Sequence, residues 1–178
     1  MATWSGIKKK LETEYLAESL RGHISYFATS YRETHDARGS RAAILYDGKE
    51  ILKGNYFAFY LKADELEDDE LKKRRLDECW GAPQLVDERV LELGIFDNYT
   101  FYQAFEKYDD QSIEDSLQSE NLLVRIFAIL DRRVGKRRLR AMREQMEREG
   151  PILRQFYALR LQAEGLSTQA VEDFKKPL

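Results

Sequence analysis

The sequence is poor in the residues that make cross-links and metal sites. Among its 178 residues it has one cysteine, Cys79, and two histidines, His23 and His35. A single cysteine cannot form an internal disulfide, and it fits a reducing compartment. Together with two histidines it cannot complete a structural zinc site unless carboxylates contribute. We therefore expect no disulfide, no metal and no other cofactor.

Long apolar runs and catalytic motifs are missing as well. No run reaches the roughly 18 apolar residues of a membrane-spanning helix, and residues 1–10 lack the apolar stretch of a signal peptide. The chain has no Walker loop and no GxGxxG, GxSxG or HExxH pattern. These absences favour a cytoplasmic, non-enzymatic protein with no membrane partner. An enzyme would have to gather carboxylates, tyrosines and the two histidines from distant parts of the chain.

Charge is abundant, and it is unevenly distributed. Charged residues make up 34% of the chain and hydrophobic residues 43%, which is typical of a soluble globular protein. Residues 63–120 carry 18 acidic and 6 basic side chains, a net charge of −12. Residues 121–148 carry 9 basic and 3 acidic side chains, a net charge of +6. Two explanations stay open: the blocks neutralise each other within the fold or across a homo-oligomer, or the basic block binds an external polyanion.

The first third of the chain predicts one helix and three strands. Apolar residues share one helical face over residues 4–20, and Thr3 is the expected N-cap. Asp47-Gly48 predicts a hairpin turn of the kind that requires positive φ at both central positions. Gly54 is a candidate bulge in the last strand. The predicted strands, rich in aromatic and β-branched residues, cover residues 23–32, 41–46 and 49–61.

From residue 64 onward the pattern is helical. Acids over 64–70 followed by bases over 72–75 complement the dipole of a single helix. Glycine and proline separate the further segments, and the aromatic side of one of them (Phe101, Tyr102, Phe105 and Tyr108) is expected to pack inward. These helices are predicted near 84–93, near 98–109, over 119–134 with Ser119 as cap, between Gly135 and Gly150, over 152–164, and from Ser167.

These elements define the predicted fold class and domain organisation. We expect an α+β fold in which an N-terminal helix and a three-stranded antiparallel sheet precede an all-helical C-terminal half with helical hairpins. Residues 1–80 would form an α-β-β-β-α module, and residues 81–178 a helical region packed on it. One continuous domain over both parts is the alternative.

The strongest candidate for a binding site is the basic turn, which we define as residues 132–140. A turn between two helices would display guanidinium groups toward phosphates or carboxylates. The alternative is that these side chains form ion pairs with the acidic residues of 63–120. Six cationic side chains lie on the two sides of Gly135: Arg132, Arg133, Lys136, Arg137, Arg138 and Arg140.

The order of helix, three strands and helix over residues 4–80 resembles the double-stranded-RNA-binding domain. Tyr26, His35 and the hairpin at residues 47–48 fall roughly where that family has its first-strand tyrosine, its loop histidine and its second turn. The resemblance implies a fold that recognises A-form RNA by shape and phosphate contacts. However, that family begins its last helix with lysines, whereas this chain has acids over 64–70, which would repel RNA. The resemblance therefore extends to topology and to no binding residue.

Several short segments also prompt a comparison over most of the chain. They are Ser30-Tyr31-Arg32 with His35-Asp36, residues 47–51 and, more specifically, residues 130–139 and 156–160. With these segments the chain is similar to an uncharacterised bacterial family of small cytoplasmic proteins. That resemblance implies no known activity and no known ligand.

The sequence leads to two functional hypotheses. The first is a non-enzymatic interaction or regulatory protein that docks an acidic protein surface, or another copy of itself, through the basic turn. The second is an RNA- or DNA-binding protein that places the same side chains on phosphates. The second predicts an affinity that falls steeply with salt, because each neutralised phosphate releases counterions.

Overall fold

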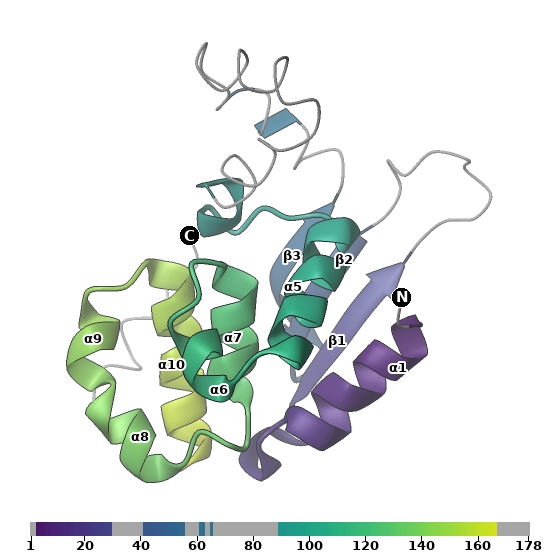
Figure 1. Cartoon of the computed structure of the whole chain (residues 1–178). Coiled ribbons are helices and arrows are strands. Elements are labelled where there is room, and N and C mark those ends of the chain that lie inside the picture. The colour runs from purple at the N-terminus through teal and green to yellow at the C-terminus, as the bar shows by residue number, and fades with distance from the viewer. Residues whose placement is uncertain (1–2, 30–40, 56–60, 63–64, 66–88, 167–178) are drawn as a thin grey trace.

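The computed structural model describes residues 3–29, 41–55, 61–62, 65 and 89–166. It has an N-terminal helix, one antiparallel sheet in the order β1-β2-β3, and a helical C-terminal half (Figure 1), so the predicted α+β class is confirmed. The first elements are α1 (Trp4–Lys9), the π-helix η1 (Lys10–Tyr15), the 3₁₀ helix η2 (Glu18–Leu20), β1 (Ile24–Thr29), β2 (Arg41–Tyr46) and β3 (Lys49–Asn55). The later helices are α5 (Asn98–Asp110), α6 (Ile113–Leu117), α7 (Leu122–Leu130), α8 (Lys136–Ala141), α9 (Arg143–Glu147) and α10 (Pro151–Ala163).

Some predictions fall where the structure describes nothing. They are His35, Cys79, most of the helix expected after residue 64, the boundary between residues 80 and 81, and the helix from Ser167. Within the described ranges, no helix is long and apolar enough to cross a membrane.

The N-terminal helix is shorter than predicted. The chain is helical through α1 and η1 but becomes extended after Tyr15, so the prediction of one helix over 4–20 is wrong beyond that residue. The reason is a tertiary contact that replaces helical hydrogen bonds. The Tyr15 carbonyl accepts from Arg132 N at 2.7 Å, and Ala17 N donates to the Leu130 carbonyl at 2.9 Å. The segment that leaves the helix is thereby attached to the start of the basic turn.

Two local predictions are confirmed by backbone geometry. Thr3 accepts a hydrogen bond from Gly6 N through its side chain, as an N-cap does. At the hairpin between β2 and β3, Asp47 has φ 48° and Gly48 has φ 74°. Both angles are positive, as the primed turn requires, and they match the right-handed twist of the two strands.

The last strand differs from its prediction in two ways. The irregularity against β2 falls at Ile51 rather than at Gly54. Gly54 serves a different purpose, because a Cβ at this position would overlap the Phe96 carbonyl. Strand β3 is described as far as Asn55, residues 56–60 lie outside the described ranges, and Leu61 is helical, so the predicted strand is wrong at residue 61. At Gly54, the lack of a side chain allows the segment at Phe96 to approach the sheet closely.

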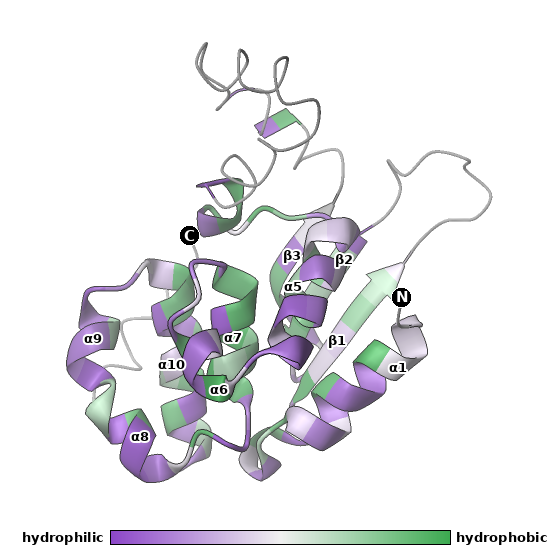
Figure 2. Ribbon diagram, in the orientation of Figure 1, coloured by the Kyte–Doolittle hydropathy of each residue, from purple (hydrophilic) through white to green (hydrophobic). Residues whose placement is uncertain are grey.

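One core joins the sheet to the later helices. Phe101 of α5 packs edge-on against Phe127 of α7 at 5.3 Å between ring centroids, and Tyr26 of β1 lies 6.0 Å from Phe127. Phe105 and Tyr108 are buried like Phe101, whereas Tyr102 is only partly buried, so the predicted inward face of α5 is confirmed for three of its four aromatic residues. Figure 2 shows α7 as largely apolar, whereas α8 and α9 at the periphery are mostly hydrophilic. The basic turn therefore leaves a buried helix and enters a solvent-facing one.

The helices on either side of the basic turn are shorter than predicted. In place of the helix expected over 119–134 the structure has α7, whose N-cap is Asn121 and not Ser119, and the short α6 before it was not predicted. Helix α7 ends at Leu130, because Asp131 is extended and its side chain accepts a hydrogen bond from the Arg133 backbone N–H. The next predicted helix is divided at Met142 into α8 and α9, and its apolar residues Leu139, Met142 and Met146 are buried.

Candidate binding site at the basic turn

The basic turn follows α7, includes most of α8 and lies against η2 and α10. Its six cations divide into two sets of three. Arg133, Lys136 and Arg138 form ion pairs with other parts of the fold. The remaining three are exposed and pair with no other described residue, and we call them the free arginines: Arg132, Arg137 and Arg140. The structure thus assigns half of the predicted site residues to holding the turn in place.

Arg133 is held by a buried carboxylate. Asp131 is 0% exposed, and its side chain accepts from Arg133 Nε at 2.9 Å and from Arg133 Nη2 at 2.7 Å. It also accepts from the Arg133 backbone N–H at 2.6 Å and from the Tyr108 hydroxyl. The guanidinium lies over the rings of Tyr15 and Tyr108, 5.1 and 5.7 Å from their centroids. Asp131 is a charge that could not be buried without these partners.

These contacts also explain the titration of the neighbouring groups. Burial, followed by the charge of Asp131, raises the pKa of Tyr108 well above its usual value. The hydrogen bonds to Asp131 raise the pKa of Arg133, so this side chain stays charged. Tyr108 therefore stays neutral and Arg133 stays charged near neutral pH, which fits a structural role for both side chains.

A second polar cluster ties the N-terminal helix to α5. Asp109 accepts from Lys10 Nζ at 2.6 and 2.9 Å and from the Tyr15 hydroxyl. Burial and then Asp109 raise the pKa of Tyr15 to about 12. Burial alone would raise the pKa of Asp109, but the bonds from Lys10 and Tyr15 outweigh it and lower that pKa. Because Tyr15 also lies beneath Arg133, the two clusters join η1, α5 and the basic turn.

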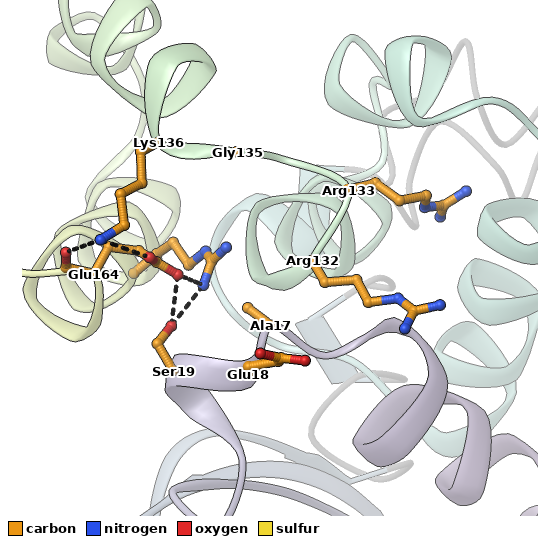
Figure 3. Close-up of a pocket in the computed structure, with 9 residues that line it drawn as sticks. Ala17, Glu18, Ser19, Arg132, Arg133, Gly135, Lys136 and Glu164 are labelled. Carbon is orange, nitrogen blue, oxygen red and sulfur yellow. Dashed lines mark hydrogen bonds and ion pairs between the residues drawn. The ribbon is translucent and has the colours of Figure 1, made fainter.

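Lys136 takes part in a third cluster, at the end of α10 (Figure 3). Glu164 accepts from Ser19 Oγ at 2.7 Å and from Arg160 Nη1 at 2.5 Å, and it lies 3.5 Å from Lys136 Nζ. Arg160 is only 3% exposed and also donates to Ser19 and to the Val134 carbonyl. Its Nε has no hydrogen-bond partner. The single carboxylate of Glu164 therefore pairs with two cations, Arg160 and Lys136, and the cluster has a net positive charge.

The titration of the two central groups follows from this crowding. Burial would raise the pKa of Glu164, but the Ser19 bond and the charges of Arg160 and Lys136 hold it below its usual value. Burial lowers the pKa of Arg160, and Glu164 opposes that effect. The carboxylate is ionised at neutral pH, and the cluster fixes η2, α10 and the turn to one another.

The contacts answer part of the question about internal neutralisation. Arg138 Nη1 lies 2.5 Å from Glu114, an acid of the 63–120 block. Arg133 pairs within its own block, and Lys136 pairs with Glu164 beyond it. Among the residues that the structure places, Glu114 is the sole member of the acidic block paired with the basic turn. Internal neutralisation is accordingly partial over this portion of the chain.

A cavity opens beside the turn. Its volume is about 550 Å³, and residues of the turn, η2 and α10 line it. Gly135 forms part of its wall, and a Cβ added there would meet nothing within 4 Å. Four cations and two acids line it. Its lining consists of Ala17, Glu18, Ser19, Arg132, Arg133, Gly135, Lys136, Arg160 and Glu164.

Sequence reasoning located the basic turn but missed the residues that complete its surroundings. Ser19, Arg160 and Glu164 come from distant segments, and nothing in a linear pattern brings them together. One signal was present: Arg160 interrupts the apolar face of α10, and Glu164 follows one helical turn later, as in an i,i+4 ion pair. Over the described ranges, no three or more histidine, cysteine, aspartate or glutamate side chains are grouped to hold a metal ion.

Comparison with known proteins gives one positive result. A family model described as the SF0329 protein family matches residues 3–161, which include every described strand and the whole basic turn. This match is consistent with the sequence resemblance to an uncharacterised family. Neither the curated proteins nor the solved structures contain a match. The chain belongs to the SF0329 protein family.

Proposed function

We propose that this protein is a non-enzymatic interaction protein that docks an acidic protein partner through the free arginines. The observation that carries the proposal is the division of the basic turn. Arg132, Arg137 and Arg140 stay exposed without a described ion pair, although acids elsewhere in the fold bind the neighbouring cations. A bacterial cytoplasmic setting belongs to the proposal and rests on the sequence resemblance and the single cysteine.

The location of the free arginines suits docking. Helices α8 and α9 form an outer edge of the molecule, remote from the sheet (Figure 1). Arg137 and Arg140 are three residues apart on α8, so their side chains emerge on neighbouring positions of one helical surface. Ion pairs on both sides of the turn hold its backbone in place. A partner would therefore meet a preorganised surface and would lose less conformational entropy on binding.

An acidic protein suits this surface better than a nucleic acid does. Affinity for a phosphate backbone grows with the number of phosphates neutralised, commonly 6–10, and only three cations of the turn are uncommitted. The whole chain has a net charge of −3 and its 63–120 block one of −12, both of which oppose a polyanion of high charge density. A few carboxylates on a protein surface match three arginines and benefit from their steering effect.

The test compares two triple variants with equal changes of charge. In the first, Arg132, Arg137 and Arg140 become Glu. In the control, three exposed lysines on α1, β3 and α5 become Glu: Lys9, Lys49 and Lys107. Affinity capture from native lysate identifies the partner, and the purified pair is then measured by titration calorimetry at low and physiological salt.

We expect the arginine variant to bind the purified partner at least about tenfold more weakly, while the lysine control stays near the wild type. Fluorescence anisotropy with duplex RNA, single-stranded RNA and duplex DNA accompanies the experiment. Equal binding by the two triple variants would refute the proposal. Salt-sensitive nucleic-acid binding that the arginine variant loses would replace it with the nucleic-acid alternative.

A further inference from the structure

We propose that Arg137 and Arg140 dock a second copy of this chain, and that the surface they bind on that copy is the exposed side of α5. This inference rests on the proposed function and names its acidic partner. Each copy carries both surfaces, so the same contact is made twice in a symmetric dimer. Two exposed stripes of side chains, one on α5 and one on α8 and α9, carry the contact.

The outer side of α5 carries unpaired acids. Glu106 and Asp110 are exposed, lie one helical turn apart and form no ion pair within the described part of the chain. Like charges at this spacing repel each other, so cations from outside would stabilise them. The same side continues through Gln103 to Tyr99, whose side chain is 56% exposed. We call this set the α5 stripe: Tyr99, Gln103, Glu106 and Asp110.

The outer side of α8 and α9 carries the opposite charge at its start. Arg137 and Arg140 are exposed and lie three residues apart. The helical path continues across the division at Met142, because this residue has αR angles and its carbonyl accepts from Met146 N at 2.9 Å. The exposed side therefore extends into α9. We call this set the α8–α9 stripe: Arg137, Arg140, Glu144 and Arg148.

The two stripes match in length and in charge. Residues 99–110 and residues 137–148 cover the same number of positions, about 16 Å along a helix. When the two helices run antiparallel, Asp110 of one copy meets Arg137 of the second copy. One turn further along, Glu106 meets Arg140. Both like-charged pairs then gain opposite charges at the spacing of a helical turn.

The remaining positions of the stripes are complementary as well. Glu144 accepts from Arg148 Nη2 at 2.9 Å within its own copy, and its carboxylate can accept a further bond from the Gln103 amide. The exposed ring of Tyr99 would lie beside the Arg148 guanidinium, as in a cation–π contact. Tyrosine and arginine are the residue types that dominate the binding energy of many interfaces. The contact thus includes one aromatic anchor in addition to ion pairs.

The placement of the helices permits this symmetry. Helix α5 and the pair α8 and α9 lie on either side of α6 and α7 and run in opposite directions (Figure 1). Between them, Arg138 Nη1 lies 2.5 Å from Glu114 of α6, so the middle of this surface is neutral. A two-fold axis through this middle, parallel to the helices, places α5 of each copy antiparallel to α8 and α9 of the other.

The dimer should be weak and sensitive to salt. Exposed ion pairs gain little in water, although the symmetry provides each pair twice. We expect a dissociation constant on the order of 100 µM at low salt. It should rise at least about tenfold when the salt concentration rises from about 50 to about 300 mM, because the charges are exposed. Such a dimer would neutralise part of the acidic 63–120 block across two copies.

A charge exchange tests the contact. The first variant combines Arg137→Glu with Arg140→Glu, and the second combines Glu106→Lys with Asp110→Lys. Either variant alone would place like charges in both contacts of a symmetric pair and should be monomeric. In an equimolar mixture of the two variants, both contacts again join opposite charges, so a mixed dimer should form.

Matched controls carry the same changes of charge outside the two stripes. They combine Lys9→Glu with Lys49→Glu, and Glu92→Lys with Glu120→Lys, at exposed positions. Circular dichroism verifies that every variant is folded. Sedimentation velocity of the full chain, at concentrations up to about ten times the expected dissociation constant, then measures the dimer.

We expect each charge-exchange variant to weaken the dimer at least about tenfold, and their mixture to return to within about threefold of the wild type. The controls should stay within about twofold of the wild type, and Tyr99→Ala should weaken the dimer about threefold. A wild type that stays monomeric at low salt would overturn the proposal. So would a dimer that survives either charge-exchange variant, or a mixture that stays monomeric.

The docking proposal is judged separately, by capture from lysate. Suppose that the wild type is monomeric but captures another acidic protein, which the variant with Arg137→Glu and Arg140→Glu loses. This result would overturn the dimer and leave the docking proposal in place. A dimer that the charge exchange abolishes and the mixture restores supports both proposals, because the second copy is then the acidic partner.

Discussion

Arg133 and Arg132 are neighbours in the chain, and the fold uses them in different ways. On the inner side of the basic turn, Arg133 reaches the buried Asp131 and lies over two tyrosine rings. On the outer side, Arg132 projects without a described ion pair, as Arg137 and Arg140 do on α8. A run of like charges in a sequence is therefore not a single functional unit. Part of it holds the backbone that presents the remainder.

The largest loss of stability is expected when the buried carboxylate of Asp131 is removed. Asp131→Ala would leave Arg133 and the Tyr108 hydroxyl without their acceptor and would remove the bond to the Arg133 backbone N–H. We expect the free energy of unfolding to fall by about 3–5 kcal/mol, because one partner of a buried ion pair is lost. Chemical denaturation followed by circular dichroism measures this. A loss below about 1 kcal/mol would show that Asp131 does not hold the turn.

Adjacent arginines provide the next test. Arg133→Ala should lower the free energy of unfolding by about 2–3 kcal/mol, since Asp131 would stay buried with fewer donors. Arg132→Ala should change it by no more than about 0.5 kcal/mol, as is usual for an exposed side chain. The two variants have the same chemistry one residue apart, and equal losses in parallel denaturation curves would contradict the division of the turn.

Some features of the fold could be predicted from the sequence, and others could not. The order of elements, the Asp47-Gly48 turn and the inward face of α5 follow from local patterns, because turn chemistry and helical periodicity act over a few residues. The end of the first helix does not, because it is decided by hydrogen bonds between the segment after Tyr15 and the basic turn. Tertiary contacts override helix propensity there.

The candidate site divides in the same manner. All six cations of the turn were identifiable from the sequence, but their roles were not. Which cations form ion pairs depends on where the fold places Asp131, Glu114 and Glu164. Asp131 stands directly before Arg132 and Arg133 in the sequence, and a linear pattern gives no reason to prefer one over the other. The preference comes from the direction in which the chain leaves α7.

The cluster at Glu164 predicts a dependence of stability on pH. Its pKa is lowered in the folded protein, so its contribution is complete above the ordinary glutamate value of 4.5 and is lost as pH falls through the lowered value. Asp109 adds a contribution of the same sign, which is complete above its ordinary value of 3.8 and is lost as pH falls through its lowered pKa. Glu164→Gln should lower the free energy of unfolding at neutral pH by about 1–2 kcal/mol.

The same variant should flatten the decline of stability between neutral and acid pH. Denaturant midpoints measured across that range for wild type and variant give the comparison, and Glu144→Gln, an exposed glutamate on α9, is the control. Parallel declines in Glu164→Gln and wild type would mean that the cluster does not titrate with folding. A flatter profile for Glu164→Gln alone assigns the acid sensitivity to the contact of α10 with the basic turn.

The smallest effect on stability is expected at the outer side of the turn. A variant with Arg137→Ala and Arg140→Ala should unfold within about 0.5 kcal/mol of the wild type, because neither side chain has a described partner to lose. Its affinity for the acidic partner should nevertheless fall, and the remaining affinity should depend less on salt. The inner side responds in the opposite way. Arg133→Ala lowers the stability of the fold, and it weakens binding only because the turn is then held less firmly. If Arg137→Ala with Arg140→Ala destabilised the fold as much as Arg133→Ala does, the outer arginines would be structural, and the docking surface would have to be sought elsewhere on the molecule.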